Sequence, residues 1–167
     1  MRRPGGLPFV AVVFALALAP IAQGKALTRS MPRQTQLLQS VNATRAAHGL
    51  RALRDNRLLD RAAGLKADAI VACQAFSHTP CAAPFRQAFV RSGYYRSRTA
   101  LGENLYYGTG SLGTPTAALE GWLASPPHRT NLLRAQWRDA GIAILHAGSL
   151  FGSSDVWLYV LDFGRRY

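Results

Sequence analysis

Apolar residues recur at helical spacing in the first half of the chain and at strand-like density near its end. From about Gln34 to His48 a spacing of three to four residues predicts a helix, which Gly49 ends. Asn56 suits the N-cap of a second helix, with an apolar stripe that runs to Ile70. Shorter helices are predicted at 83–91, 115–124 and 126–134, with Ser125 as N-cap and proline opening each of the last two.

The clearest strand signals come late in the chain. Residues 141–146 and 156–163 are rich in β-formers and are separated by Gly and Ser turn residues. Residues 101–107 also favour an extended segment, and the glycine-rich stretch 108–113 favours a flexible loop. Because helices precede most of the strands, the pattern predicts an α+β domain with helices packed on a small antiparallel sheet.

The N-terminus has the pattern of a secretory signal peptide. Arg2 and Arg3 precede an unbroken apolar run of 11 residues from Phe9 to Ala19, and small residues stand before Lys25. The run is well short of the roughly 20 residues that a spanning helix needs. We therefore expect cleavage after residue 24, with an uncleaved anchor as the alternative. A tail at 25–33 and a single domain at 34–167 would follow, in a secreted or extracytoplasmic protein.

The chain is strongly basic, with 20 Lys+Arg against 8 Asp+Glu and a net charge of +12. Loss of residues 1–24 would leave +10. Such a charge suits docking on an anionic envelope lipid or cell-wall polymer. Export and the lack of a nucleic-acid motif argue against a nucleic-acid partner, and we expect a monomer. A basic face is predicted on the first two helices from five arginines: Arg45, Arg51, Arg54, Arg57 and Arg61.

Two cysteines, Cys73 and Cys81, lie eight positions apart. In an oxidising compartment they favour a disulfide, which would stabilise the domain by roughly 2–3 kcal/mol. Two free buried thiols are the alternative. Two cysteines are too few for a structural zinc site built from three or four thiolates.

Two of the four histidines differ from ordinary surface positions. His78 lies between the cysteines, and His128 lies in the first turn of a helix. The positive end of the helix dipole disfavours an imidazolium there, and a neutral histidine suits a metal ligand or a general base. His48 and His146 flank glycines and have ordinary surface or capping interpretations. Fifty residues of separation do not by themselves place His78 beside His128.

Several motifs in order resemble the CAP superfamily, which comprises the cysteine-rich secretory proteins, antigen 5 and the pathogenesis-related 1 proteins. The resemblance covers about residues 34–164, and the motifs are most similar to those of the compact bacterial branch. The segments that carry it are Phe76-Ser77-His78, Gly102-Glu103-Asn104-Leu105, the stretch from Trp122 through Ser125-Pro126 and His128-Arg129 to Leu133, Gly141-Ile142-Ala143, and Trp157 to Gly164.

The resemblance implies an α-β-α sandwich with a central cleft lined by two His and one or two Glu. Carried over, the cleft residues are His78, Glu103 and His128, with Ser125 beside them. In some members the two histidines bind a divalent metal such as Zn²⁺. Glu103 has two open roles, as a carboxylate that orients a histidine or as a proton-transfer group. Glu120 stands before Trp122 rather than after it, so its place in the cleft is doubtful.

Three functions remain open on this evidence. The first is a binding protein with a divalent metal, a lipid or a peptide-like ligand in the cleft. The second is a metal-assisted hydrolase that uses His78, His128 and Glu103, although His-Glu-x-x-His and Gly-x-Ser-x-Gly motifs are absent from the sequence. The third is a basic protein that docks on the envelope through its charge. Fold does not decide among them.

Overall fold

The structure is a computed structural model that describes residue 1 and residues 32–167. Apart from Met1, the predicted signal peptide lies outside the described residues, as does the tail up to residue 31. Within the described part of the chain, no helix is long and apolar enough to cross a membrane.

Within residues 32–167, five α-helices form close to their predicted positions: α1 (Arg33–Ala47), α2 (Arg57–Cys73), α3 (Gln87–Ser92), α4 (Pro115–Ala124) and α5 (Pro126–Leu132). Asn56 caps α2 as predicted, because its side chain accepts hydrogen bonds from the backbone N–H groups of Leu58 and Leu59. The third helix begins four residues later than predicted. Pro84, which has no N–H to donate, lies in the irregular segment before it.

Four strands in the described part of the chain form one sheet in the order β1-β3-β4-β2. Their bounds are β1 (Arg54–Asp55), β2 (Thr99–Thr109), β3 (Asp139–Leu150) and β4 (Ser153–Arg166). The three long strands pair antiparallel, as predicted. The two-residue β1 pairs parallel with β3, which makes the sheet mixed rather than purely antiparallel. The predicted loop at 108–113 is replaced by the end of β2 and a short 3₁₀ turn at Gly110–Leu112.

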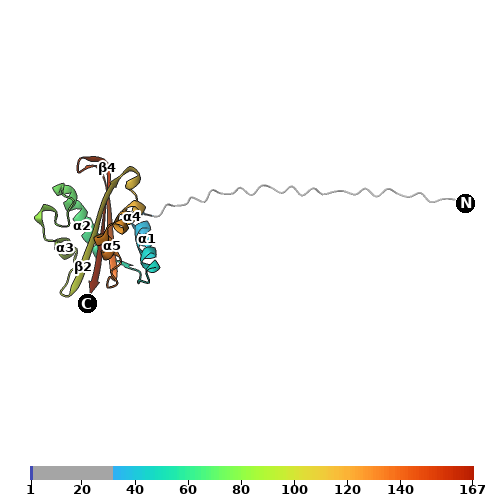
Figure 1. Ribbon diagram of the computed structural model, residues 1–167, viewed down its shortest axis with the longest axis horizontal. Helices are drawn as coiled ribbons and strands as arrows, with labels where there is room; N and C mark the ends of the chain where they lie inside the picture. The colour runs from blue at the N-terminus through green and yellow to red at the C-terminus, as the bar shows by residue number, and fades with distance from the viewer. Residues whose placement is uncertain (2–31) are drawn as a thin grey trace. The chain divides into compact units, whose positions relative to one another are not determined.

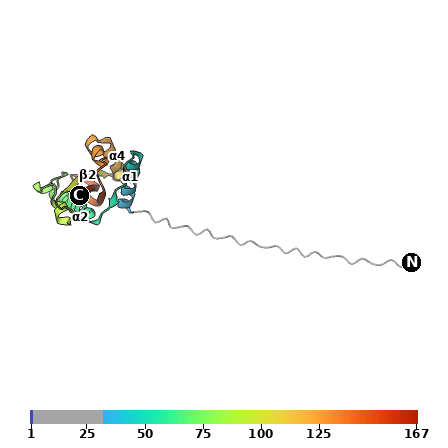
Figure 2. The same ribbon diagram turned by 90° about the horizontal axis from the view of Figure 1, so that it is seen from below.

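Helices cover both faces of the sheet, which gives the α-β-α sandwich (Figure 1). One face carries α2 and α3, and the other carries α1, α4 and α5; the view in Figure 2 again places β2 between α2 and the pair α1 and α4. Alternation along β4 matches these layers. Leu158 and Val160 belong to the core cluster under α2, whereas Tyr159, Leu161 and Phe163 belong to the cluster on the opposite face.

Glycine allows the closest approach between α2 and the sheet. A Cβ at Gly141 on β3 would overlap the backbone at Leu59 and Asp60 of α2. The Asp60 carboxylate also accepts a hydrogen bond of 2.9 Å from the Ile142 N–H. The start of α2 is therefore held directly on β3, which fixes the helix that later carries Lys66.

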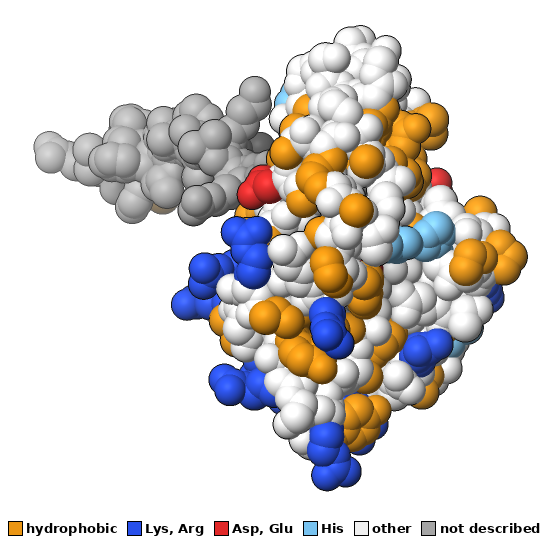
Figure 3. Space-filling view, turned by 90° about the vertical axis from the view of Figure 1, so that its left-hand side faces the viewer, with side chains coloured by type: hydrophobic (Ala, Val, Ile, Leu, Met, Phe, Trp, Pro, Cys, Tyr) orange, Lys and Arg blue, Asp and Glu red, His pale blue; other side chains and the backbone are white. Residues whose placement is uncertain are grey.

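The predicted basic face on the first two helices is wrong at one position. Arg45 is fully buried, and its guanidinium donates hydrogen bonds to the carbonyls of Arg51, Leu132 and Arg134. It therefore ties α1 to the end of α5 instead of facing a partner. The other four arginines of that set are exposed, although Arg54 pairs with Asp139 at 2.9 Å. On the face seen in Figure 3, Lys and Arg side chains are spread as separate groups over the surface.

Candidate functional site

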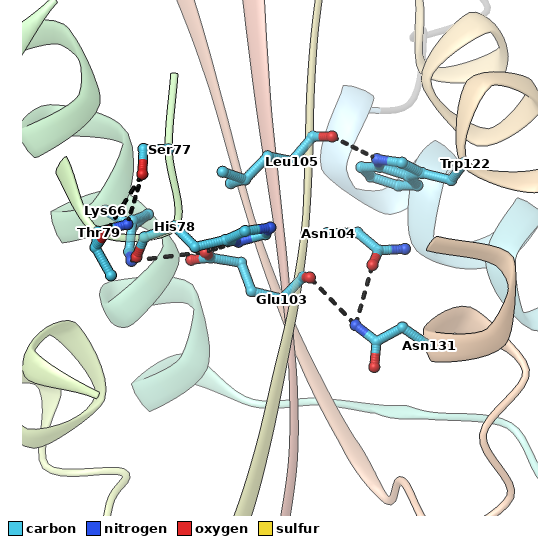
Figure 4. Close-up of polar contacts among 9 residues, drawn as sticks. All are labelled: Lys66, Ser77, His78, Thr79, Glu103, Asn104, Leu105, Trp122 and Asn131. Atoms are coloured by element: carbon cyan, nitrogen blue, oxygen red, sulfur yellow. Dashed lines mark hydrogen bonds and ion pairs between the residues drawn. The ribbon is translucent and has the colours of Figure 1, made fainter. Parts of the chain in front are cut away.

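His78 lies in a loop that two contacts hold against α2. The disulfide between Cys73 and Cys81 closes this loop, as predicted. Lys66, on α2, donates a hydrogen bond from Nζ to the His78 backbone carbonyl. Figure 4 shows Lys66 and His78 together beside β2. The His78 side chain remains 49% exposed, so its ring is held from behind and open in front.

Glu103 binds the ring of His78 from inside the protein. Its side chain is fully buried on β2, and Oε1 lies 2.7 Å from Nδ1 of His78 and 3.5 Å from Nζ of Lys66. A carboxylate only accepts hydrogen bonds, so the proton of this contact resides on Nδ1. In the neutral ring, Nε2 then keeps its lone pair. Glu103 thus orients His78, the first of the two roles left open above.

His128, in the first turn of α5, has a comparable tether. Its Nδ1 lies 2.8 Å from Oγ of Ser125. Ser125 occupies the N-cap position of α5 as predicted, yet its side chain makes no capping hydrogen bond. Its hydroxyl bonds the His128 ring instead. Pro127, the second helical residue, has no backbone N–H that a capping side chain could accept from. The serine that we predicted as a helix cap is therefore a partner of the histidine.

Two asparagines attach α5 to β2 and so place His128. Asn104, fully buried, donates from Nδ2 to the His128 carbonyl at 3.1 Å. Asn131 donates from Nδ2 to the Glu103 carbonyl at 3.2 Å and to Oδ1 of Asn104 at 3.0 Å. Along β2, the Glu103 side chain points toward α2 and the Asn104 side chain toward α5 (Figure 4). Consecutive residues of one strand therefore support the two histidines from opposite sides.

The surroundings of His128 disfavour the charged form of its ring. Burial lowers the pKa of His128, and the nearby His78 lowers it further. The direction agrees with the prediction, and burial is the larger of these two causes. A neutral imidazole with Nδ1 engaged presents one nitrogen to a ligand.

His78 and His128 line one open hollow of about 580 Å³, together with Glu103, Asn104, Pro126, Pro127, Thr130, Asn131 and Arg134. Glu120 does not line it. That residue is exposed on α4, and its charge acts on Tyr106. His48 and His146 also lie elsewhere, with partners at Thr44 and Asp155.

The donor set suits a metal site with two protein ligands at most. Both Nδ1 atoms have oxygen partners, the arrangement that commonly orients metal-binding histidines. Over residues 32–167, however, no group of three or more His, Cys, Asp or Glu is placed to hold a metal ion. Catalytic zinc sites generally have three protein ligands. A metal here would depend on water or a bound ligand for its remaining positions.

Ser125, the two histidines and Glu103 do not contact one another as a Ser-His-Glu triad would. Ser125 contacts His128, whereas Glu103 contacts His78. A triad needs one histidine between a nucleophile and a carboxylate. The contacts in the described residues instead form two pairs, each of which holds one ring in place.

Two buried charged residues beside the site were missed in the sequence. Lys66 is 4% exposed. It follows Leu59 by seven positions and precedes Ile70 by four, so it falls on the apolar stripe of α2, and this spacing could have indicated that it is buried. Asp162, fully buried on β4, is the one acid in an otherwise apolar run. An isolated charge inside a buried pattern was the available signal.

Comparison with known proteins agrees with this architecture. The family model described as the cysteine-rich secretory protein family, CAP, matches residues 38–163. No curated protein sequence matches the chain. Among solved structures, an extracellular protein with an SCP domain from Bacillus anthracis has a TM-score of 0.67 and 23% identity, over 80% of this chain and 40% of that one.

Two further solved structures show the same fold. An outer surface protein from Borrelia burgdorferi has a TM-score of 0.65 and 19% identity, over 80% of this chain and 92% of that one. A cysteine-rich secretory protein from Staphylococcus aureus has a TM-score of 0.61 and 19% identity, over 80% of this chain and 38% of that one. The chain thus spans about two fifths of the first and third proteins.

The fold and the site define an α-β-α sandwich with two tethered histidines in one hollow. With the family match over residues 38–163, this chain belongs to the cysteine-rich secretory protein family, CAP.

Proposed function

We propose that this chain is an extracytoplasmic binding protein in which His78 and His128 act together on one ligand. The observation that carries the proposal is that both rings line one hollow and each is tethered at Nδ1. A ring fixed through Nδ1 directs Nε2 as its remaining donor or acceptor. A divalent ion such as Zn²⁺ is the ligand this nitrogen pair suits best, and a bound ion would supply open coordination positions for a further group.

The surroundings of the two rings support binding rather than proton transfer. Glu103 is turned inward onto His78 and Lys66, which engage its Oε1. The hollow is open, so a ligand would reach the rings without movement of the core. A lipid or peptide-like group bound in the same hollow is the second form of this proposal, with Pro126 and Pro127 as apolar walls.

Three features support the extracytoplasmic location. The sequence predicts a signal peptide at residues 1–24. In addition, two of the proteins with similar structures are described as extracellular and as an outer surface protein. A disulfide between Cys73 and Cys81 suits the oxidising conditions outside the cytoplasm.

Calorimetric titration of the untagged protein with Zn²⁺ tests the proposal. The wild type should take up one ion per chain, and the double variant His78→Ala/His128→Ala should take up none. A matched control removes the other two histidines, His48→Ala/His146→Ala, and should retain uptake. Circular dichroism checks that every variant is folded.

The proposal of a metal site is refuted if the His78→Ala/His128→Ala variant binds Zn²⁺ with unchanged stoichiometry. It is refuted equally if the wild type binds none. In the second case, titration with a phospholipid vesicle and with a soluble peptide mixture, each followed by the ring signals of His78 and His128, decides the second form. Absence of any ring response would end the two-histidine proposal altogether.

A further inference from the structure

Asp162 faces the buried side of the candidate site. On the central strand β4 it lies directly opposite Glu103 of β2 in the antiparallel register. Side chains of such cross-strand partners lie on the same face of the sheet. Both carboxyl groups are therefore on the α2 side, and both are buried. The two acids form a buried carboxyl pair behind His78.

The pair has three oxygen atoms without a partner. Among the residues that the structure describes, Oε2 of Glu103 and both side-chain oxygens of Asp162 accept no hydrogen bond. Unsatisfied buried polar atoms are rare in folded proteins because their desolvation is not repaid. Oε1 of Glu103 already has His78 and Lys66. Three of the four unsatisfied buried side-chain atoms in the described part of the chain thus belong to these two acids.

Charge also argues against two ionised acids here. Lys66 is the cation beside the pair, and it lies 3.5 Å from Glu103. Asp60 of α2 adds a further negative charge. Adjacent carboxylates in a buried place cannot both keep their charge at low cost. Lys66 offsets the charge of one acid at most, so the local charges favour a neutral form of the second acid.

We propose that Asp162 is a positioning residue of the two-histidine site: as a neutral acid it donates its O–H to Oε2 of Glu103. The inference rests on the proposed function and deepens it. One shared proton satisfies an oxygen of each acid at once. Glu103 is then held at both oxygens, by Asp162 at Oε2 and by His78 with Lys66 at Oε1.

The electrostatics point the same way as the geometry. Burial raises the pKa of Asp162 well above its usual range, and the neighbouring Glu103 raises it further, while Lys66 opposes the shift. The consequence reaches the surface of the site. A fixed Glu103 keeps the proton of His78 on Nδ1, which leaves Nε2 directed away from the carboxylate.

Carbon-13 NMR of the wild-type chain tests the proton directly. With labelled aspartate, the Asp162 Cγ signal at pH 7 should lie at the position of a protonated carboxylic acid rather than at that of a carboxylate. An Asp162 signal at the carboxylate position at pH 7 would overturn the inference. This measurement needs neither a ligand nor a variant, so its outcome is independent of the Zn²⁺ titration.

Two substitutions then test the positioning role. Asp162→Asn keeps a donor of the same shape, and Asp162→Leu removes it. We expect nitrogen-15 spectra to show the His78 proton on Nδ1 in the wild type and in Asp162→Asn. In Asp162→Leu the ring should populate both tautomers. An unchanged His78 spectrum in a folded Asp162→Leu variant would reduce Asp162 to a packing residue and overturn the role; if that variant does not fold, the wild-type carbon signal decides.

Discussion

Replacement of Lys66 by methionine should expose how strongly the site depends on one buried cation. Lys66 is 4% exposed, and its partner Glu103 has a fully buried side chain. Methionine fills much of the lysine stem, so packing changes little. What is lost is the charge that compensates Glu103, together with the hydrogen bond to the His78 carbonyl. Removal of one member of a buried ion pair costs about 3–5 kcal/mol, because the other charge stays buried without compensation.

That loss is large against the 5–15 kcal/mol that stabilises a typical domain. Urea unfolding, followed by the fluorescence of the buried Trp122 and Trp137, measures it. With a slope of about 1–3 kcal/mol per molar urea, the midpoint should fall by on the order of 2 M. Arg61→Met is the matched control, since Arg61 is exposed on the same helix. It should change the free energy of unfolding by about 0.5 kcal/mol or less.

A double variant separates charge from packing. In Lys66→Met/Glu103→Gln no buried anion is left unpaired, so more than half of the lost stability should return. The reasoning is refuted if Lys66→Met unfolds within about 1 kcal/mol of the wild type. It is refuted also if Lys66→Met lowers the free energy of unfolding equally in the wild type and in Glu103→Gln, because the two side chains would then have no coupling energy.

Three further predictions follow from separate features. The pKa of His128 should lie below the ordinary histidine value of about 6.5. The free energy of unfolding should therefore fall as the pH drops below about 6.5, because the unfolded chain binds the proton first. An NMR titration midpoint of the His128 ring at or above about 6.5 would contradict this. Replacement of Cys73 and Cys81 by serine should lower the free energy of unfolding by about 2–3 kcal/mol, and a loss below about 1 kcal/mol would count against the loop-closure account. Gly141→Ala should destabilise by about 3 kcal/mol or more, since its Cβ would overlap the α2 backbone, whereas Gly148→Ala has open space and serves as control; equal melting temperatures would be inconsistent with that contact.

The elements that were predictable have local signals. The helix at 115–124 was predicted with the observed bounds, because Pro115 opens it and Ser125 with Pro126 ends it. Strand β1 was not predictable. It is two residues long, and it exists only because Arg54 and Asp55 pair with β3, some 85 positions later. Local pattern carries no information about that pairing.

The site shows the same division. His78, Glu103 and His128 were found by motif, and the hollow brings them together. Their partners were not found, since the contacts cross between elements. Lys66 on α2 contacts His78 in a loop and Glu103 on β2. Asp162 lies opposite Glu103 only because of the register of β2 and β4. The chain has two glutamates, Glu103 and Glu120, and the structure puts Glu120 outside the hollow.

The measurement that most directly tests the two-histidine site is nitrogen-15 NMR of the histidine rings during addition of Zn²⁺. The account predicts that Nδ1 of His78 and of His128 keep their partners, and that the Nε2 signals of both rings shift together and saturate with a single equivalent. A shift of only one of these rings, or an equal response at His48 and His146, would contradict the claim that His78 and His128 form one site.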